Sequence, residues 1–295
     1  MKILITGGTG QLGRDCVKVL ENNHRVVSVG SKVLDIGDRQ AVTTFIKKEK
    51  PNAIVNCAAF TQVDKCETKK DVAWRVNAEG PRNLAAAARK TDSQLIHIST
   101  DYVFDGKKPV PEVYTEQDKT GPINYYGITK LAAEKAVAQE TDRFAILRTA
   151  WMYGIGGPNF LKTMLRLTLP DPNRQIHVVN DQFGAPTWSY RLALQIARLL
   201  ESDGQGIYHA TSEGYCTWYE LASEFLNRME VPHSLGPCTT PEYPTPAERP
   251  MNSILENRRL KESGINLMVD WKQDVREFVI RFKDRLIKEA RGERL

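Results

Sequence analysis

Tyr126 and Lys130 are the two residues whose types and spacing could do chemistry. On a helix, this four-residue spacing places both side chains on one face, where they can reach one point. A phenol normally holds its proton until about pH 10, and a nearby ammonium is expected to lower that pKa toward neutrality. The pair could therefore act as a general acid that protonates a carbonyl oxygen.

The position of this pair supports that interpretation more strongly than the spacing does. The chain holds 10 tyrosines, so a Tyr–Lys pair at this distance arises easily by chance. Thr100, however, follows an apolar run at 94–98 that reads as a buried strand, and ligands bind at the carboxyl ends of strands in open α/β sheets. The threonine hydroxyl could hydrogen-bond the same carbonyl oxygen and hold it in place.

A glycine-rich turn near the start of the chain predicts a nucleotide site. Gly7, Gly10 and Gly13 lie between an apolar run at 2–6 and a helical pattern at 16–20. Glycines allow a tight turn and a close approach of the backbone to a pyrophosphate, and the N–H groups at the helix start can bind its oxygens. The order strand, glycine turn, helix favours a dinucleotide site over a plain structural turn.

The end of the next strand, at 25–29, indicates which dinucleotide. No carboxylate follows this strand to hold a ribose 2′-hydroxyl. Ser31 and Lys32 stand there instead and could accommodate a 2′-phosphate, which favours NADPH. Lys32 could equally be an ordinary solvated loop residue, in which case NADH also binds. Asp35 and Ile36, just beyond, could meet the adenine edge.

The alternation of strands and helices predicts the architecture that positions these residues. We expect an α/β fold: a Rossmann-like, doubly wound parallel sheet with a smaller C-terminal α/β domain. Residues 1–150 would form the NADP(H)-binding domain and 151–295 mainly the substrate domain, with the helix at 189–200 packing back on the sheet. In the second half we further expect helices at 158–167, 217–226 and 270–291, a strand at 206–210, and a proline-rich loop at 237–250 that is either a lid or a rigid connection.

Composition limits the classes of partner. The net charge is +5, but basic and acidic residues are interspersed, which favours a solvated surface over nucleic acid binding. The 5 cysteines have no metal-site spacing, so we expect free thiols and no metal site. No apolar segment is long enough to span a membrane and no export signal is recognisable, so a cytoplasmic protein is expected.

The motifs together resemble a known family. The glycine turn, Thr100 and the Tyr126–Lys130 pair resemble the extended short-chain dehydrogenase/reductases that act on nucleotide sugars. Four further blocks are similar to the dTDP-4-dehydrorhamnose reductases within that superfamily, and their order spans nearly the whole chain: 56–65, 99–106, 148–154 and 180–187.

The resemblance implies the final step of dTDP-L-rhamnose biosynthesis. In that step a hydride passes from NADPH to C4 of dTDP-4-dehydro-β-L-rhamnose. By the same resemblance, Tyr126 protonates the C4 oxygen, Lys130 lowers the tyrosine pKa and holds the nicotinamide ribose, and Thr100 orients the ketone. This makes a dTDP-sugar the expected small-molecule partner.

The same resemblance assigns binding residues. For the cofactor it implies contacts with the pyrophosphate, the adenosine end and the middle of the molecule from Gly10, Gln11, Leu12, Asp35, Ile36, Ala59, Phe60 and Thr61. For the sugar nucleotide it implies Thr61, Val63, Asp101, Tyr102, Trp151 and, at a phosphate, Arg249. Lys162 and Arg166 could also meet the diphosphate or simply face solvent. Asn77 could be a structural amide or part of a proton relay.

Several alternatives stay open at this point. Some relatives dimerise through Mg²⁺ held by glutamates, but here Arg14 and Asp15 follow the glycine turn, which makes a magnesium dimer doubtful and leaves monomer or homodimer undecided. A 4,6-dehydratase is disfavoured because Tyr102 stands where dehydratases carry a glutamate. Another nucleotide-sugar reductase or an epimerase remains possible. A non-catalytic regulatory subunit, like that of methionine adenosyltransferase, is disfavoured by the intact Thr100, Tyr126 and Lys130.

Overall fold

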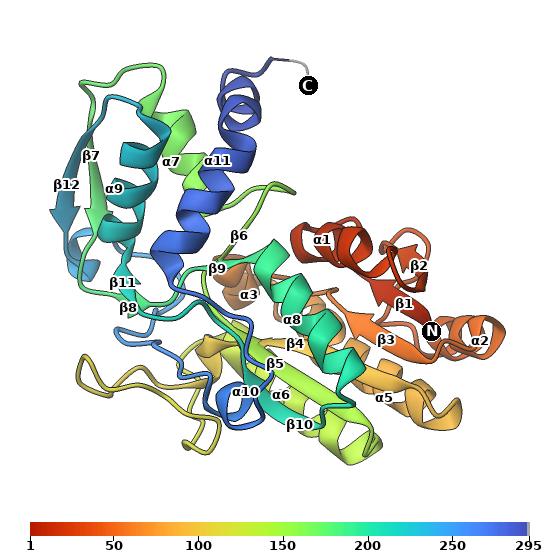
Figure 1. The fold of residues 1–295 in the computed structure, drawn as a ribbon. Helices are drawn as coiled ribbons and strands as arrows, with labels where there is room; N and C mark the ends of the chain where they lie inside the picture. The colour runs from red at the N-terminus through yellow and green to blue at the C-terminus, as the bar shows by residue number, and fades with distance from the viewer. Residues whose placement is uncertain (294–295) are drawn as a thin grey trace.

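A parallel sheet of six strands forms the centre of the computed structural model, which describes residues 1–293 (Figure 1). The strand order is β10-β5-β4-β3-β1-β2, and every neighbouring pair is parallel. β1 lies between β2 and β3, where the order reverses, and such a switch point opens a crevice at the carboxyl ends of the strands. The strands are β1 (Lys2–Thr6), β2 (Arg25–Val29), β3 (Ala53–Asn56), β4 (Gln94–Thr100), β5 (Phe144–Thr149) and β10 (Gly206–His209).

Helices cover both faces of this sheet, which is why its central strands are continuous apolar runs. One face packs against α1 (Gln11–Leu20) and α8 (Ser189–Glu201). The other face packs against α2 (Arg39–Glu49), α5 (Gly80–Lys90) and α6 (Tyr125–Glu140). The predicted doubly wound α/β fold is confirmed.

A smaller α/β unit gathers beyond the carboxyl end of the sheet, at the upper left of Figure 1. Its core is rich in large aromatic side chains, with Trp188, Tyr153 and Phe278 buried together. Its elements are α7 (Phe160–Thr168), α9 (Trp218–Met229), α11 (Trp271–Ala290), and the paired strands β7 (Gln175–Val179) with β12 (Ser234–Cys238), β6 (Met152–Tyr153) with β9 (Thr187–Trp188), and β8 (Phe183–Gly184) with β11 (Cys216–Thr217).

Short helical segments connect these elements. Thr217 caps α9 in a capping box with Glu220. The remaining segments are α3 (Val63–Thr68), α4 (Lys70–Trp74), the π-helical turn η1 (Arg75–Glu79), the 3₁₀ turns η2 (Asp101–Val103) and η3 (Thr240–Glu242), and α10 (Arg258–Glu262).

The chain returns from the second half to the first unit twice. α8 packs against α1, as expected for the helix at 189–200. β10 pairs with β5 and becomes the sixth strand of the large sheet, which the sequence did not indicate. We therefore propose a cofactor unit of residues 1–150 together with α8 and β10, and a substrate unit built from most of the remaining chain.

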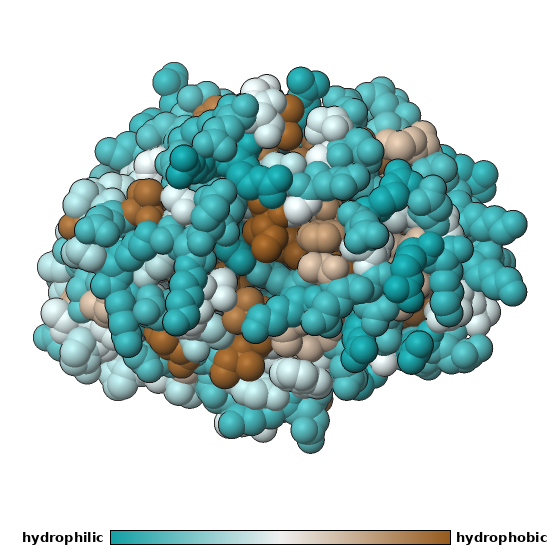
Figure 2. Space-filling model, turned by 90° about the horizontal axis from the view of Figure 1, so that it is seen from below, coloured by the Kyte–Doolittle hydropathy of each residue, from teal (hydrophilic) through white to brown (hydrophobic). Residues whose placement is uncertain are grey.

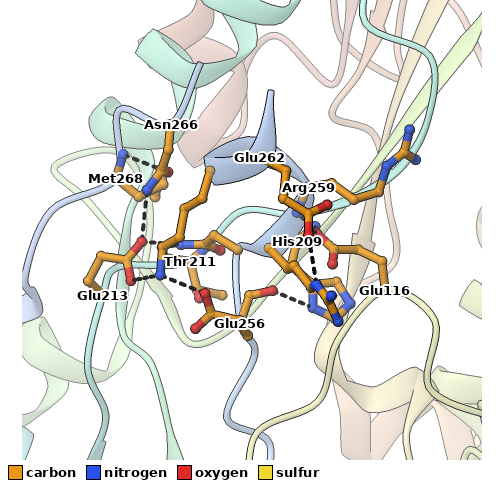
Figure 3. Close-up of polar contacts among 12 residues, drawn as sticks. Glu116, His209, Thr211, Glu213, Glu256, Arg259, Glu262, Asn266 and Met268 are labelled. Atoms are coloured by element: carbon orange, nitrogen blue, oxygen red, sulfur yellow. Dashed lines mark hydrogen bonds and ion pairs between the residues drawn. The ribbon is translucent and has the colours of Figure 1, made fainter. Parts of the chain in front are cut away.

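A cluster of polar contacts fastens the edge strand β10 to α10 (Figure 3). The Glu116 carboxylate accepts from the backbone N–H groups of His209 and Arg259, at 3.0 and 3.2 Å. The Arg259 guanidinium donates to the carbonyl oxygens of Ile207 and Gln205. Covering an edge strand in this way satisfies backbone groups that would otherwise be free to pair with another chain.

The surface seen in Figure 2 is mostly hydrophilic, with a few hydrophobic side chains gathered near its centre. All five cysteines are free thiols. Within residues 1–293 no helix has the length and apolar character needed to cross a bilayer, and no group of three or more potential metal ligands occurs.

Candidate active site

The end of β4 and the start of α6 bring Thr100, Tyr126 and Lys130 together. Thr100 is the last residue of β4, and Asn124 caps α6 by accepting from the Gly127 backbone N–H at 2.9 Å. A Cβ at Gly127 would lie 2.2 Å from the carbonyl oxygen of Tyr102, so only glycine lets the helix start against η2. The ring of Tyr126 consequently meets the ring of Tyr102 edge to face, with centroids 5.9 Å apart.

Tyr126 holds its proton firmly in this environment. Burial and the nearby Asp101 carboxylate raise the pKa of the Tyr126 phenol, whereas the neighbouring Thr100 hydroxyl lowers it. The expected lowering of this pKa by Lys130 is not seen in this structure, where the lysine amine donates to the Ile98 carbonyl oxygen instead. A fully protonated phenol is still what a proton donor requires at neutral pH.

Lys130 is buried beneath the site, with 2% of its surface exposed. Its Nζ donates to the carbonyl oxygen of Ile98 at 2.5 Å and lies 3.3 Å from Nε2 of His97. Burial lowers the pKa of Lys130 to about 8, against the opposing effect of Glu134. The lysine is therefore an ammonium at neutral pH that loses its proton in mildly alkaline solution.

Asp101 shares the hydroxyl of Thr100. Thr100 Oγ1 donates to Asp101 Oδ1 at 2.9 Å, while Oδ2 of this carboxylate has no hydrogen-bond partner among residues 1–293. Burial raises the pKa of Asp101 to about 6. A hydroxyl has one proton, so Thr100 can donate to a ketone oxygen or to the Tyr126 phenolate only when it turns away from Asp101.

The glycine turn has the geometry that close approach to a pyrophosphate needs. Gly7 has a φ of +67°, and a Cβ there would lie 2.6 Å from the Ala58 backbone nitrogen. A Cβ at Gly13 would lie 2.2 Å from the Gly7 carbonyl oxygen. Gly10 is the N-cap of α1, so the free N–H groups of Gln11 and the residues after it face the crevice beyond β1.

The side chains of Leu12 and Gln11, next to this turn, make contacts within the protein. Leu12 is buried in the core under α1, so only its backbone can face a cofactor. The Gln11 side chain accepts from Asn159 Nδ2 at 3.0 Å, which ties the turn to the start of α7 in the smaller unit.

An exposed ion pair lies at the predicted adenosine end. Ser31 and Lys32 are exposed in the turn after β2. The Asp35 carboxylate binds Arg75 at 2.6 Å, and this hydrogen bond lowers the pKa of Asp35. Arg75 lies on η1, far along the chain, and no local pattern pointed to it. Ile36 is buried against Gly80, which leaves its backbone as the group that could meet adenine.

The segment after β3 is fixed by Asn77. This buried amide accepts from the Phe60 N–H at 2.7 Å and donates to the Phe60 carbonyl oxygen at 3.0 Å and to Thr129 at 3.2 Å. Asn77 therefore has the structural role that the sequence left open. It positions the segment that holds Ala59, Phe60 and Thr61, which connects β3 to α3.

Arg249 reaches the predicted sugar-nucleotide side. Its guanidinium donates to Asp64 at 2.8 Å and to the Ala247 carbonyl oxygen at 2.9 Å. Burial raises the pKa of Tyr102, and the positive charge of Arg249 acts against this rise. Val63 begins α3, the helix that carries Asp64.

The proline-rich loop makes hydrogen bonds to two neighbouring segments. Asn124, the cap of α6, donates from Nδ2 to the Glu248 carbonyl oxygen at 2.8 Å, and Ala247 N–H donates to Asp64. The loop is thus tied to both α3 and the helix that carries Tyr126.

Trp151 and Lys162, two further residues considered for the sugar nucleotide, contact side chains of the smaller unit. Trp151 has a φ of +46° and stacks on Trp218, with ring centroids 3.6 Å apart, at the edge of the smaller unit's core. Trp218 was not anticipated as its partner. Lys162 donates to Glu289 and to the Ile155 carbonyl oxygen, so it faces α11 rather than a diphosphate.

A Rossmann sheet with a glycine turn at its switch point and a Thr–Tyr–Lys set at the end of β4 defines a nucleotide-dependent oxidoreductase of the short-chain dehydrogenase/reductase class. The chain belongs to the family described as "RmlD substrate binding domain", whose model matches residues 1–283.

Named relatives agree with this assignment. A dTDP-4-dehydrorhamnose reductase of Streptomyces griseus is 40% identical over 93% of this chain and 91% of the relative. A dTDP-4-keto-6-deoxy-D-glucose reductase of Streptomyces niveus is also 40% identical, over 91% of this chain and 93% of the relative. The crystal structure of the Bacillus anthracis dTDP-4-dehydrorhamnose reductase in complex with NADP is 36% identical, covers 95% of this chain and 99% of its own, and superposes with a TM-score of 0.92. The predicted resemblance and enzyme class are confirmed.

Proposed function

We propose that this protein reduces the C4 ketone of dTDP-4-dehydro-β-L-rhamnose with NADPH and releases dTDP-L-rhamnose, the last step in the synthesis of that nucleotide sugar. The observation that carries this proposal is the Thr100–Tyr126–Lys130 set, which lies at the carboxyl end of β4 in a chain similar throughout its length to dTDP-4-dehydrorhamnose reductases.

The residues of this chain divide the work as follows. The glycine turn and the first N–H groups of α1 bind the cofactor pyrophosphate. Ser31 and Lys32 bind the 2′-phosphate at the end of β2, where no carboxylate follows the strand to repel it. When bound, NADPH supplies the hydride that attacks C4. Tyr126 donates its phenolic proton to the C4 oxygen as this bond forms, and the resulting phenolate is reprotonated from solvent.

The sugar nucleotide would occupy the region between α3, η2 and the loop around Arg249. Arg249 supplies positive charge for a phosphate, although Asp64 already neutralises part of it. Thr61, Val63, Asp101, Tyr102 and Trp151 complete the proposed pocket.

A second candidate substrate has a specific observation behind it. The Streptomyces niveus relative, at the same 40% identity, is described as a reductase of dTDP-4-keto-6-deoxy-D-glucose. That compound is a C4 ketone on the same nucleotide and differs in sugar stereochemistry. The two substrates therefore need the same Tyr126 and the same cofactor site.

A substrate panel separates these candidates. The purified protein is incubated with NADPH and either 4-keto sugar nucleotide, and the products are identified by NMR. Our proposal expects a kcat/KM at least tenfold higher for dTDP-4-dehydro-β-L-rhamnose, with dTDP-L-rhamnose as product. A preference for the D-glucose-derived ketone would move the assignment to the second candidate. NADPH binding without oxidation by either ketone would favour an epimerase or a regulatory subunit.

We also propose that the enzyme acts in the cytoplasm, where NADPH and nucleotide sugars are made, as a monomer or homodimer without a magnesium site. Cell fractionation tests the location. Measurement of the molar mass by light scattering, with and without Mg²⁺, tests the oligomeric state and the absence of a magnesium dimer.

A further inference from the structure

A chain of buried polar groups lies behind the proposed catalytic residues, and the reaction described above makes no use of it. His97, in the middle of β4, is completely buried. Its Nδ1 lies 3.0 Å from Nδ2 of Asn56, at the end of β3, and its Nε2 lies 3.3 Å from Nζ of Lys130. The position of the hydrogen on this imidazole therefore decides whether Lys130 faces a hydrogen-bond donor or an acceptor.

The orientation of the Asn56 amide is fixed by a backbone group. The Ala58 N–H can only donate, and it donates to Asn56 Oδ1 at 3.1 Å. The Thr6 hydroxyl donates to the same oxygen at 2.7 Å. The other side of the amide, Nδ2, must then face His97 and donate to its Nδ1.

This contact fixes the tautomer of His97. Burial and the nearby Lys130 charge hold the pKa of His97 well below its usual range, so the imidazole is neutral and carries one proton. Because Nδ1 accepts from Asn56, that proton lies on Nε2 and points at the lysine amine.

The consequence for Lys130 concerns its own hydrogens. An ammonium has three N–H groups, and one of them goes to the Ile98 carbonyl oxygen. A His97 with hydrogen on Nε2 cannot accept a second one. The other charged or titratable groups acting on the amine are Glu134 on α6 and the Cys57 thiol after β3, which both favour the charged form.

We propose that Asn56 and His97 are positioning residues for Lys130: Asn56 locks the Nε2–H tautomer, and this tautomer leaves two N–H groups of the lysine for the cofactor ribose and Tyr126. The Nε2–H group of His97, which faces the ammonium, also makes it easier for Lys130 to lose a proton. The ribose and Tyr126 roles rest on the proposed function, whereas the tautomer itself does not.

The tautomer can be measured directly by ¹⁵N NMR of the imidazole in uniformly labelled, ligand-free protein, with His97 assigned from backbone connectivities. We expect hydrogen on Nε2 and a bare Nδ1 between pH 6 and 9. Hydrogen on Nδ1 in the wild-type protein would overturn the proposal, whether or not the protein proves to be a reductase.

Asn56→Asp should reverse the lock. The carboxylate still accepts from Ala58 and Thr6, and its second oxygen now accepts from Nδ1–H of His97. We expect the ¹⁵N signals to show hydrogen on Nδ1, and an unchanged tautomer would contradict the argument. Thr6→Val is the matched control, because it removes one donor to Asn56 but keeps the Ala58 contact. It should leave the Nε2–H tautomer in place.

Activity supplies the second readout. In Asn56→Asp, Nε2 of His97 carries no hydrogen and accepts one from the Lys130 ammonium, which stabilises the charged lysine. The pH at which kcat/KM falls in alkaline solution should therefore rise by about one unit. Because one N–H group of Lys130 is then no longer free for the ribose, KM for NADPH should rise roughly three- to tenfold. The new charge could act on Lys130 without His97, so the same substitution is repeated in a His97→Leu background. A shift of equal size there would overturn transmission through the imidazole, and a clearly smaller one supports it.

Discussion

Replacing Tyr126 by phenylalanine isolates the proton-donor role. The phenylalanine ring keeps the edge-to-face contact with Tyr102, and the Thr100 hydroxyl keeps Asp101 as its partner. The fold and both binding sites should therefore remain, while the proton for the C4 oxygen is lost. General acid catalysis contributes about 10²- to 10⁴-fold, so kcat should fall by that factor, which corresponds to about 3–5 kcal/mol of transition-state stabilisation.

The assay follows NADPH absorbance under single-turnover conditions, with NADPH affinity measured separately by fluorescence. We expect an unchanged dissociation constant for NADPH and a melting temperature within a few degrees of the wild type. A kcat within about threefold of the wild-type value would refute Tyr126 as the proton donor.

Three further predictions concern the cofactor, the core and the pH dependence. Lys32→Ala should narrow the ratio of kcat/KM for NADPH over NADH, and an unchanged ratio would make Lys32 a plain loop residue. Glu134→Gln should lower the free energy of urea unfolding by about 3 kcal/mol, because it leaves the buried Arg148 without its carboxylate; Glu262→Gln, in an exposed pair, is the control and should cost less than about 0.5 kcal/mol. Asp101 has a raised pKa of about 6, so its protonated carboxyl group contributes to the free energy of unfolding below about pH 4, and this contribution is lost as the pH rises through 6. Asp101→Asn should remove this loss of up to about 3 kcal/mol, and parallel stability curves for the two proteins would contradict the assignment.

The sequence predicted the features that depend on local pattern. The strand predicted at 94–98 is present as β4, and the helical pattern predicted for Tyr126 and Lys130 is present as α6. The glycine turn was recognisable because its backbone geometry admits only glycine at Gly7 and Gly13.

The features that the sequence did not predict come from contacts between distant segments. Asp35 meets Arg75, Trp151 meets Trp218, and β10 joins the sheet beside β5. None of these pairings follows from spacing or periodicity, because each depends on how whole elements pack.

The error about Lys130 has the same origin. Four-residue spacing correctly put both residues on α6, but the contacts of Nζ are made with β4. The carbonyl oxygen of Ile98 lies within reach and accepts one hydrogen of the amine, and the imidazole of His97 lies 3.3 Å from it.

Hydride transfer to C4 is the central claim, and isotopic labelling tests it most directly. The protein is given NADPH with deuterium at the transferable nicotinamide position and dTDP-4-dehydro-β-L-rhamnose, and the product is analysed by NMR. Our account predicts dTDP-L-rhamnose with one deuterium at C4 for each NADPH oxidised. Oxidation of NADPH without deuterium at C4, or no oxidation of a cofactor that demonstrably binds, would contradict it.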